Sequence, residues 1–258
     1  MNITWHGNAS IALESEGTRL LFDPFVPLPG AATPTRPEVF HGFPNILITH
    51  GHLDHLLNTP ALAKNGAVVY CTKTPRITLI NAGTDASRIV PVAPGGTLSF
   101  GPVRVIALKG KHAKFDPPLV LRTLLSPRML KYPENRALIR KTHPHFLEKG
   151  ETLIFKIETE EKTILLLGSM ALPPGIVTKD YARPDVLILP YQGHTNNLKY
   201  AIEMMRELSP RTVLLDHFDD AFPPASRNVD LTPFLAAMKE QRPGIKVIVP
   251  KAGEPIRF

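Results

Sequence analysis

Short apolar runs and alternations of apolar with polar residues recur along this chain, and each predicts a β-strand. Residues 10–15 (SIALES) alternate, as a half-buried strand does, whereas residues 45–50 (NILITH) form an apolar run that ends in polar residues. Residues 151–169 predict a hairpin that turns at Glu160 and Glu161. The other predicted strands lie at 3–5, 18–25, 67–72, 88–92, 97–100, 103–108, 185–190, 212–217 and 246–250.

Helical spacing of apolar residues separates several of these strands. The predicted helices lie at 54–66, 74–83, 134–141, 195–208 and 231–241. Asn65 and Gly66 close the first of them, and the second has Thr74 as its cap with Pro75 at its first position.

This order of elements predicts an α/β (α+β) fold. Two mixed β-sheets packed face to face, with helices on the outer faces, would bury the apolar side of every element. The sequence contains no linker, composition break or short-period repeat. We therefore expect one domain that spans residues 1–258.

The charge of the chain is unevenly distributed. The 258 residues contain 30 Lys and Arg and 23 Asp and Glu, a net charge of +7. Residues 109–149 contain ten of the basic and three of the acidic residues, so this one segment carries the whole excess. The net positive charge, which attracts phosphates, is thus a property of one region. This distribution favours a local anionic ligand over nucleic acid.

Several classes of protein are disfavoured by composition. A single cysteine, Cys71, excludes an intramolecular disulfide framework and a cysteine-only metal cluster, and its apolar surroundings predict a buried thiol. The first residues lack the basic start and long apolar run of a signal peptide, and no stretch approaches the ~18 apolar residues of a transmembrane helix. We expect a soluble, cytoplasmic protein.

The motif THGHLDH places four metal-ligating side chains directly after a predicted buried strand: His50, His52, Asp54 and His55. His50 and His52 are two apart in extended chain, so they project from the same face and can hold one cation. The turn into the next helix sends Asp54 and His55 towards a neighbouring position, where a second cation could bind. Imidazole and carboxylate suit zinc, iron or manganese. The alternative is a polar loop whose histidines only cap the helix.

THGHLDH resembles the H-x-H-x-D-H signature of the metallo-β-lactamase fold, and the resemblance extends along nearly the whole chain. The opening ITWHGNASIALESEGTRLLFDPF and the segment DVLILPYQG resemble the branch that contains L-ascorbate-6-phosphate lactonase and N-acyl-phosphatidylethanolamine phospholipase D. The resemblance implies a four-layered αββα sandwich with metals at one edge, between the sheets. It also implies a metal-activated hydroxide that attacks an ester, lactone or phosphodiester.

The resemblance implies two sets of ligands. His50, His52 and His112 would hold the first metal, and Asp54, His55 and His217 the second. His112 follows the predicted strand 103–108 within a few residues, and its alternative role is that of a solvated histidine in a basic loop. His217 ends the predicted strand 212–217, and its alternative role is that of a core histidine.

The sequence departs from the family pattern at two positions. Ser169 stands where the family has a bridging aspartate, and a neutral hydroxyl cannot shield two dications held ~3.5–4 Å apart. The second site is then weak or empty, unless another carboxylate helps; the candidates are Asp216, Asp219 and Asp220. Asn8 stands where the branch has a histidine, and His6, two residues earlier on the same strand face, could replace it.

Three further residues have candidate roles near the metals. Asp54 is a ligand or a proton acceptor. Asp23 is expected to orient a metal-bound histidine, or else to cap the turn before Pro24. His194, between a strand end and a helix start, is a candidate general acid or substrate-binding group, or else a surface residue.

His112 lies near the start of the basic segment 109–149, and we call residues 113–149 the flap. Its predicted helix at 134–141 displays Arg136, Arg140 and Lys141 on overlapping faces. The flap is either a lid that binds an anionic head group, with or without an apolar tail, or a solvated insertion or oligomer interface.

The sequence thus predicts a metal-dependent hydrolase that acts on a small anionic ester, lactone or phosphodiester. It would hold one or two divalent transition metals, with zinc favoured over manganese or iron. The alternatives are a metal-dependent nuclease and a metal-binding protein with weak hydrolytic activity. Aromatic residues for base stacking are few in the flap, so a nucleic-acid partner is disfavoured, whereas a homo-oligomer remains open.

Overall fold

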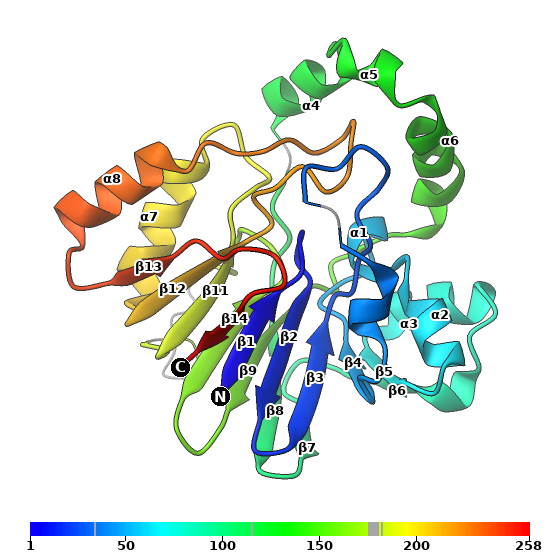
Figure 1. Cartoon of the computed structure of the whole chain (residues 1–258), viewed down its shortest axis with the longest axis horizontal. Helices are drawn as coiled ribbons and strands as arrows, with labels where there is room; N and C mark the ends of the chain where they lie inside the picture. The colour runs from blue at the N-terminus through cyan, green and yellow to red at the C-terminus, as the bar shows by residue number, and fades with distance from the viewer. Residues whose placement is uncertain (34, 115, 175–180, 182) are drawn as a thin grey trace.

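A computed structural model describes residues 1–33, 35–114, 116–174, 181 and 183–258 of the chain. Two seven-stranded mixed sheets lie face to face, and helices cover their outer faces (Figure 1). The predicted sandwich is therefore confirmed.

The first sheet is built from the N-terminal strands and the last strand of the chain. Its strands, in spatial order, are β14 (Pro255–Arg257), β1 (Asn2–Trp5), β2 (Ile11–Ser15), β3 (Thr18–Phe22), β4 (Asn45–Leu47), β5 (Val68–Cys71) and β6 (Ile89–Pro91). Pairing is antiparallel from β14 to β3 and parallel from β3 to β6. The register sets Asn2 opposite Arg257, so the two ends of the chain are adjacent.

The second sheet repeats this arrangement of antiparallel and parallel halves. Its strands, in spatial order, are β13 (Lys246–Ile248), β12 (Thr212–Asp216), β11 (Val186–Pro190), β10 (Thr163–Leu167), β9 (Leu153–Glu158), β8 (Val103–Lys109) and β7 (Thr97–Phe100). β10 to β13 are parallel, and β7 to β10 are antiparallel. All five residues of β11 are buried, as a strand covered on both faces requires.

Helices complete the outer layers. The first sheet is covered by α1 (Leu53–Leu56), α2 (Thr59–Lys64) and α3 (Lys73–Asn81), and the second by α7 (Asn197–Leu208) and α8 (Thr232–Gln241) (Figure 1). The flap contains α4 (Pro117–Leu124), α5 (Arg128–Lys131) and α6 (Pro133–Thr142). Three short 3-10 helices are η1 (Pro37–Phe40), η2 (Ala86–Arg88) and η3 (His143–His145).

Three apolar layers hold the sandwich together. Between the sheets, Phe22 of β3 packs with Phe155 of β9, with ring centroids 5.7 Å apart. The other two layers lie between each sheet and its helices. Each buried side chain of leucine or phenylalanine size contributes roughly 1.5–3 kcal/mol to stability.

The strands that lead to the metal motif are shorter than predicted. β3 ends at Phe22 because Asp23 takes a left-handed backbone conformation (φ 44°), and β4 ends at Leu47. Asp23 N donates to Leu47 O (3.1 Å), which holds the two strand ends side by side. The polar residues after each strand are thereby free to gather at one edge of the sandwich.

Some predicted boundaries are wrong. The helix predicted at 54–66 is two helices, since Pro60 at the start of α2 has no N–H with which to continue α1. α3 begins at Lys73 with Thr72 as its N-cap residue, not at Pro75 with Thr74 as cap. α4, α5 and β14 have no counterpart among the predictions.

In the described part of the chain, no helix is both long enough and apolar enough to cross a membrane.

Candidate metal centre

The six predicted ligands come from three segments of the chain at one edge of the sandwich. His50 and His52 lie between β4 and α1, and His52 is the N-cap residue of α1. Asp54 and His55 lie on α1 itself, while His112 follows β8 and His217 follows β12. His217 has a left-handed backbone (φ 51°), which turns the chain out of β12 as soon as the strand ends. Both sheets therefore supply ligands to the same edge.

The first group consists of three imidazoles, those of His50, His52 and His112. Its candidate ligand atoms all lie within 4.8 Å of one another. The ring centroid of His112 lies 4.9 Å from that of His50 and 4.4 Å from that of His52. His50 Nε2 is 3.1 Å from His52 Nδ1. Three imidazoles this close together can serve as the ligands of a tetrahedral cation that keeps one open position.

The second group consists of Asp54, His55 and His217, whose candidate ligand atoms also lie within 4.8 Å of one another. Asp54 Oδ2 lies 3.1 Å from His217 Nε2 and 3.8 Å from His55 Nε2. The two groups are adjacent, since the ring centroids of His50 and His55 are 4.0 Å apart. The arrangement offers two neighbouring cation sites.

A buried hydrogen-bond network orients the histidines. His55 Nδ1 donates to Asp23 Oδ2 (2.8 Å), and Thr49 donates to Asp23 from both its backbone N (2.8 Å) and its Oγ1 (2.5 Å). Because the Thr49 hydroxyl proton points to Asp23, its oxygen accepts from His50 Nδ1 (3.0 Å). Both imidazoles then have their protons on Nδ1 and their lone pairs on Nε2, free for a metal.

Thr49 is a residue of this network that sequence reasoning missed. The signal was weak: a threonine at the end of an apolar run, directly before His50. Its neighbour Gly168 is required by packing, since a Cβ at that position would come within 2.6 Å of Thr49 Cβ.

A comparison with protein families covers all six of these ligands. The beta-lactamase superfamily domain model matches residues 2–217, from the first strand to the last of the six histidine and aspartate ligands. This chain belongs to the beta-lactamase superfamily.

Curated relatives match the chain over nearly its full length. A protein of Methanocaldococcus jannaschii named UPF0173 metal-dependent hydrolase is 27% identical over 258 residues, which are 99% of this chain and 100% of that protein. A protein of Cereibacter sphaeroides with the same name is 28% identical over 263 residues, 100% of both chains.

Solved structures share the fold at low identity. Igni18, a metallo hydrolase from Ignicoccus hospitalis, has a TM-score of 0.71 at 20% identity and covers 100% of this chain and 98% of its own. An isothiocyanate hydrolase from Delia radicum gut bacteria has a TM-score of 0.64 at 16% identity and covers 100% and 99%. CmlA, a diiron β-hydroxylase from Streptomyces venezuelae, has a TM-score of 0.68 at 16% identity and covers 100% of this chain and 54% of its own.

The histidines of the first group are neutral at pH 7. Burial lowers the pKa of His50 well below its ordinary value, and the neighbouring histidines add to the effect. For His52, burial and His112 outweigh the attraction of Asp54 and lower the pKa to about 4. Burial also lowers the pKa of His112. Neutral imidazole is the form that ligates a metal.

The second group carries charge. Burial opposes ionisation of Asp54, but His55 and the hydrogen bond from His217 outweigh it and hold the pKa of this carboxyl below its usual range. Burial likewise opposes protonation of His217, but the hydrogen bond and the charge of Asp54 outweigh it and raise the pKa of the imidazole. His217 Nδ1 is buried and has no hydrogen-bond partner in the described part of the chain.

Ser169 lies near this centre. It is 9% exposed, and its Oγ accepts from Ala113 N (3.0 Å). Ser169 therefore fixes the residue directly after His112, and its hydroxyl adds no charge between the two groups.

The candidate carboxylates near His217 differ in their surroundings. Asp220 pairs with Arg128 and accepts from Ser226 Oγ (3.0 Å), so it anchors the flap and is outside both ligand groups. Asp219 Oδ1 accepts from Asn8 N (3.0 Å), and Asp216 is buried with one carboxylate oxygen unpartnered in the described structure.

Asn8, and not His6, contacts the metal centre. The Asn8 amide donates to Asp54 O (2.8 Å), and Asn8 O accepts from His217 N (2.8 Å). The ring of His6 packs edge-on against Phe40, with centroids 5.6 Å apart. Asn8 thus ties two residues of the second group to the loop after β1.

His194 is buried between protein groups. Its Nε2 donates to Met170 O (3.1 Å), its Nδ1 lies 3.7 Å from Asp116 Oδ1, and its ring stacks on Tyr200 with centroids 3.8 Å apart. These contacts give His194 a position beside the first residues of the flap.

The flap is fastened to the sandwich at several points. Asp116 accepts from Thr195 N (2.8 Å), Asn135 donates to Pro223 O (2.8 Å), and His145 O accepts from Thr78 Oγ1 (2.9 Å). Of the predicted substrate-binding residues on α6, Arg140 and Lys141 are exposed. Arg136 is half-buried, and its Nε lacks a hydrogen-bond partner among the described residues.

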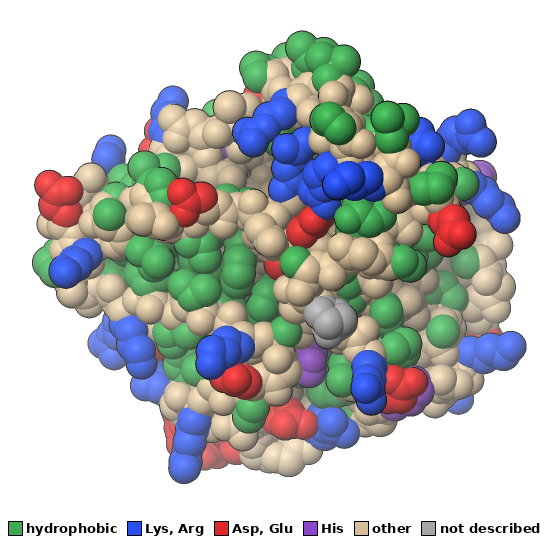
Figure 2. Space-filling view, turned by 45° about the horizontal axis from the view of Figure 1, so that its top comes forward, with side chains coloured by type: hydrophobic (Ala, Val, Ile, Leu, Met, Phe, Trp, Pro, Cys, Tyr) green, Lys and Arg blue, Asp and Glu red, His purple; other side chains and the backbone are tan. Residues whose placement is uncertain are grey.

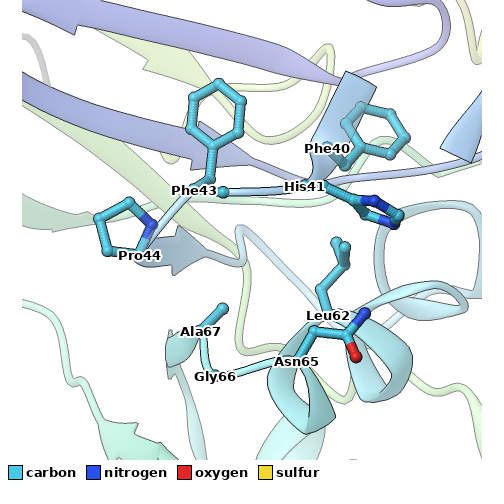
Figure 3. Close-up of a pocket in the computed structure, with 9 residues that line it drawn as sticks. Phe40, His41, Phe43, Pro44, Leu62, Asn65, Gly66 and Ala67 are labelled. Carbon is cyan, nitrogen blue, oxygen red and sulfur yellow. The ribbon is translucent and has the colours of Figure 1, made fainter. Parts of the chain in front are cut away.

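A separate pocket lies between η1 and α2 (Figure 3). Figure 3 shows Phe40, Phe43 and Leu62 beside it, with His41 and Asn65 as its polar side chains. None of the predicted site residues lines it. The pocket is therefore separate from the histidine and aspartate cluster, which is the candidate site for catalysis.

Proposed function

We propose that this chain, a metal-dependent hydrolase of the beta-lactamase superfamily, holds one or two divalent transition metals in the cluster and hydrolyses a small anionic ester, lactone or phosphodiester. The observation that carries the proposal is the convergence of six side chains from three segments of the chain into two adjacent groups. The resemblance to the branch with a lactonase and a phosphodiesterase supports the substrate class.

The donor set fits a transition metal. With the Nδ1 protons of His50 and His55 directed to Thr49 and Asp23, the Nε2 lone pairs face the cluster. Two imidazoles whose Nε2 lone pairs face the same cluster are stabilised by a cation beside them. Imidazole with one carboxylate favours zinc, with manganese and iron as alternatives.

A bound divalent cation supplies a Lewis acid for the oxygen of the scissile group and a source of hydroxide at neutral pH. The residues of the chain position the reaction. Asp23 and Thr49 fix the histidine tautomers, Asn8 fixes Asp54, and Ser169 fixes the loop of His112. Asp54, ionised beside His217, serves as ligand or as acceptor of the proton released during hydrolysis.

We infer that the first group binds its metal more tightly than the second. Three imidazoles alone form the first group, whereas the second has one carboxylate, and Ser169 places no negative charge between the two. Without a bridging carboxylate, the repulsion between two dications is poorly compensated.

The flap supports an anionic substrate. It begins beside His112 and is rich in Lys and Arg. Arg136, Arg140 and Lys141 are the proposed contacts for the anionic group, because all three are positively charged residues of α6.

The test is turnover of a lactone, a carboxylate ester and a phosphodiester by the zinc-loaded protein. We expect steady hydrolysis of at least one of them. The turnover rate should fall by at least about a hundredfold in His52→Ala, because that variant removes a ligand. His145→Ala, an exposed histidine in η3, is the matched control and should retain activity. Equal turnover by His52→Ala and the wild type would exclude the proposed site.

A further inference from the structure

The first two helices of the flap present an apolar surface to solvent. We call residues 117–131 the flap tip. Its exposed apolar side chains are Val120 (43%), Leu121 (57%), Leu124 (61%), Leu125 (73%) and Leu130 (78%). In α4 they recur at spacings of three and four, so they form one stripe along the helix.

The tip does not contribute to the core. Neither α4 nor α5 contains a buried residue. Figure 1 shows α4 and α5 on an arch that stands away from the sheets, and Figure 2 shows hydrophobic side chains gathered at the top of the molecule. Burying this stripe would stabilise the protein, and leaving it exposed is a cost that a binding surface explains.

Positive charge surrounds the stripe. Arg122 of α4 and Lys131 of α5 are exposed, and Figure 2 shows Lys and Arg side chains beside the apolar group. Two copies of the chain that met at this face would bring together two flap tips, each with three basic residues and no acidic residue. Charge complementarity therefore favours an anionic partner over a second copy.

The shape of the tip favours a lipid surface. An apolar stripe flanked by basic side chains, on a part of the molecule that protrudes, can enter the boundary between lipid head groups and acyl chains. We propose that the flap tip docks on anionic lipid membranes, with Leu121, Leu124 and Leu125 inserted and with Arg122 and Lys131 against the lipid phosphates. None of these residues belongs to the metal centre, so the proposal is independent of the proposed function.

The test is co-sedimentation of the full chain with phosphatidylcholine vesicles, with and without phosphatidylglycerol. We expect binding to the anionic vesicles only. The double variant Leu124→Asp/Leu125→Asp should weaken binding at least about tenfold, because two apolar side chains no longer leave water. The double variant Arg122→Gln/Lys131→Gln should weaken it by roughly fivefold per residue and reduce its dependence on salt.

Matched controls distinguish docking through the flap tip from nonspecific adsorption of the protein to vesicles. Leu235, on α8, is also exposed (38%), and Leu235→Asp should bind anionic vesicles as the wild type does. Insertion itself can be seen with Leu121→Trp, since the natural Trp5 is buried and stacked on Phe218. The fluorescence of this variant should move to shorter wavelength with anionic vesicles, and that of Leu235→Trp should not.

Three results would overturn the proposal. The first is no binding of the wild type to anionic vesicles. The second is equal binding by the wild type and Leu124→Asp/Leu125→Asp. The third is self-association that this double variant abolishes without any binding to vesicles, which would assign the tip to contacts between copies of the chain.

Discussion

Asp23 is the side chain on which the order of the metal centre most depends. It is 1% exposed and binds His55 directly and His50 through Thr49. A carboxylate can only accept, so it dictates that the imidazole proton of His55 sits on Nδ1. One residue therefore controls the lone pairs of ligands in both groups.

Replacing Asp23 with Asn should weaken metal binding by about 10–100-fold, because an amide can donate to Nδ1 and favour the wrong tautomer. Affinity is measured by competition with a chromophoric chelator. Asp185→Asn is the control, since Asp185 pairs with Arg211 and Thr163, outside the metal centre. An unchanged affinity in a folded Asp23→Asn protein would contradict this role.

The burial of Cys71 predicts the reactivity of its thiol. Its side chain is fully buried in β5, and burial raises the pKa of the thiol to about 12. Because the thiolate is the reactive form, the folded protein should resist alkylation at pH 8 and react only once denatured. Mass spectrometry after treatment with iodoacetamide checks this, and stoichiometric labelling of the native protein would contradict it.

The candidate site could be predicted from sequence where its residues follow strands. His50, His52 and His217 stand at the polar ends of apolar runs, and such ends meet at one edge of a sheet. Thr49 could not be assigned in this way, because its role depends on contacts with Asp23 across two strands. The same limit applies to Asp220, whose partner Arg128 is distant in sequence.

At the scale of elements, α3 shows how distant segments complete a helix. Its N-cap residue Thr72 makes no side-chain cap hydrogen bond, and Glu151 Oε2 instead accepts from Thr74 N (2.7 Å). The cap comes from a residue 77 positions away, so local sequence placed the start of the helix wrongly. The helices α4 and α5 also have no counterpart among the predictions, and neither contains a buried residue.

Glu151→Gln should lower the free energy of unfolding by about 0.5–1 kcal/mol at pH 7, the scale of a lost cap. Burial opposes ionisation of Glu151, but the hydrogen bonds from Thr74 outweigh it and lower its pKa. The charged form therefore contributes stability above the ordinary glutamate pKa, and this is lost as the pH falls through the lowered value.

Urea unfolding at several pH values measures this effect. The loss of free energy of unfolding in Glu151→Gln, relative to the wild type, should shrink towards acid pH. Glu240→Gln, at an exposed position of α8, should have the same free energy of unfolding as the wild type. A difference between Glu151→Gln and the wild type that is constant with pH would contradict the assignment.

At the scale of the whole molecule, the two sheets meet at the metal centre. His50 follows a strand of the first sheet, and His112 and His217 follow strands of the second. The order of strands and helices along the chain predicted this sandwich, because two sheets face to face with helices outside bury the apolar side of each element. The flap stands outside those patterns, and its place over the edge of the sandwich is set by contacts such as Asn135 to Pro223.

Metal analysis of the purified protein tests the central claim most directly. Mass spectrometry should find about one tightly held transition metal per chain in the wild type, since the three histidines form a site that needs no bridging carboxylate. His52→Ala should lose this metal, His145→Ala should keep it, and Ser169→Asp should move towards two. A wild-type protein that holds no metal after loading, or a His52→Ala variant that holds as much as the wild type, would contradict the account.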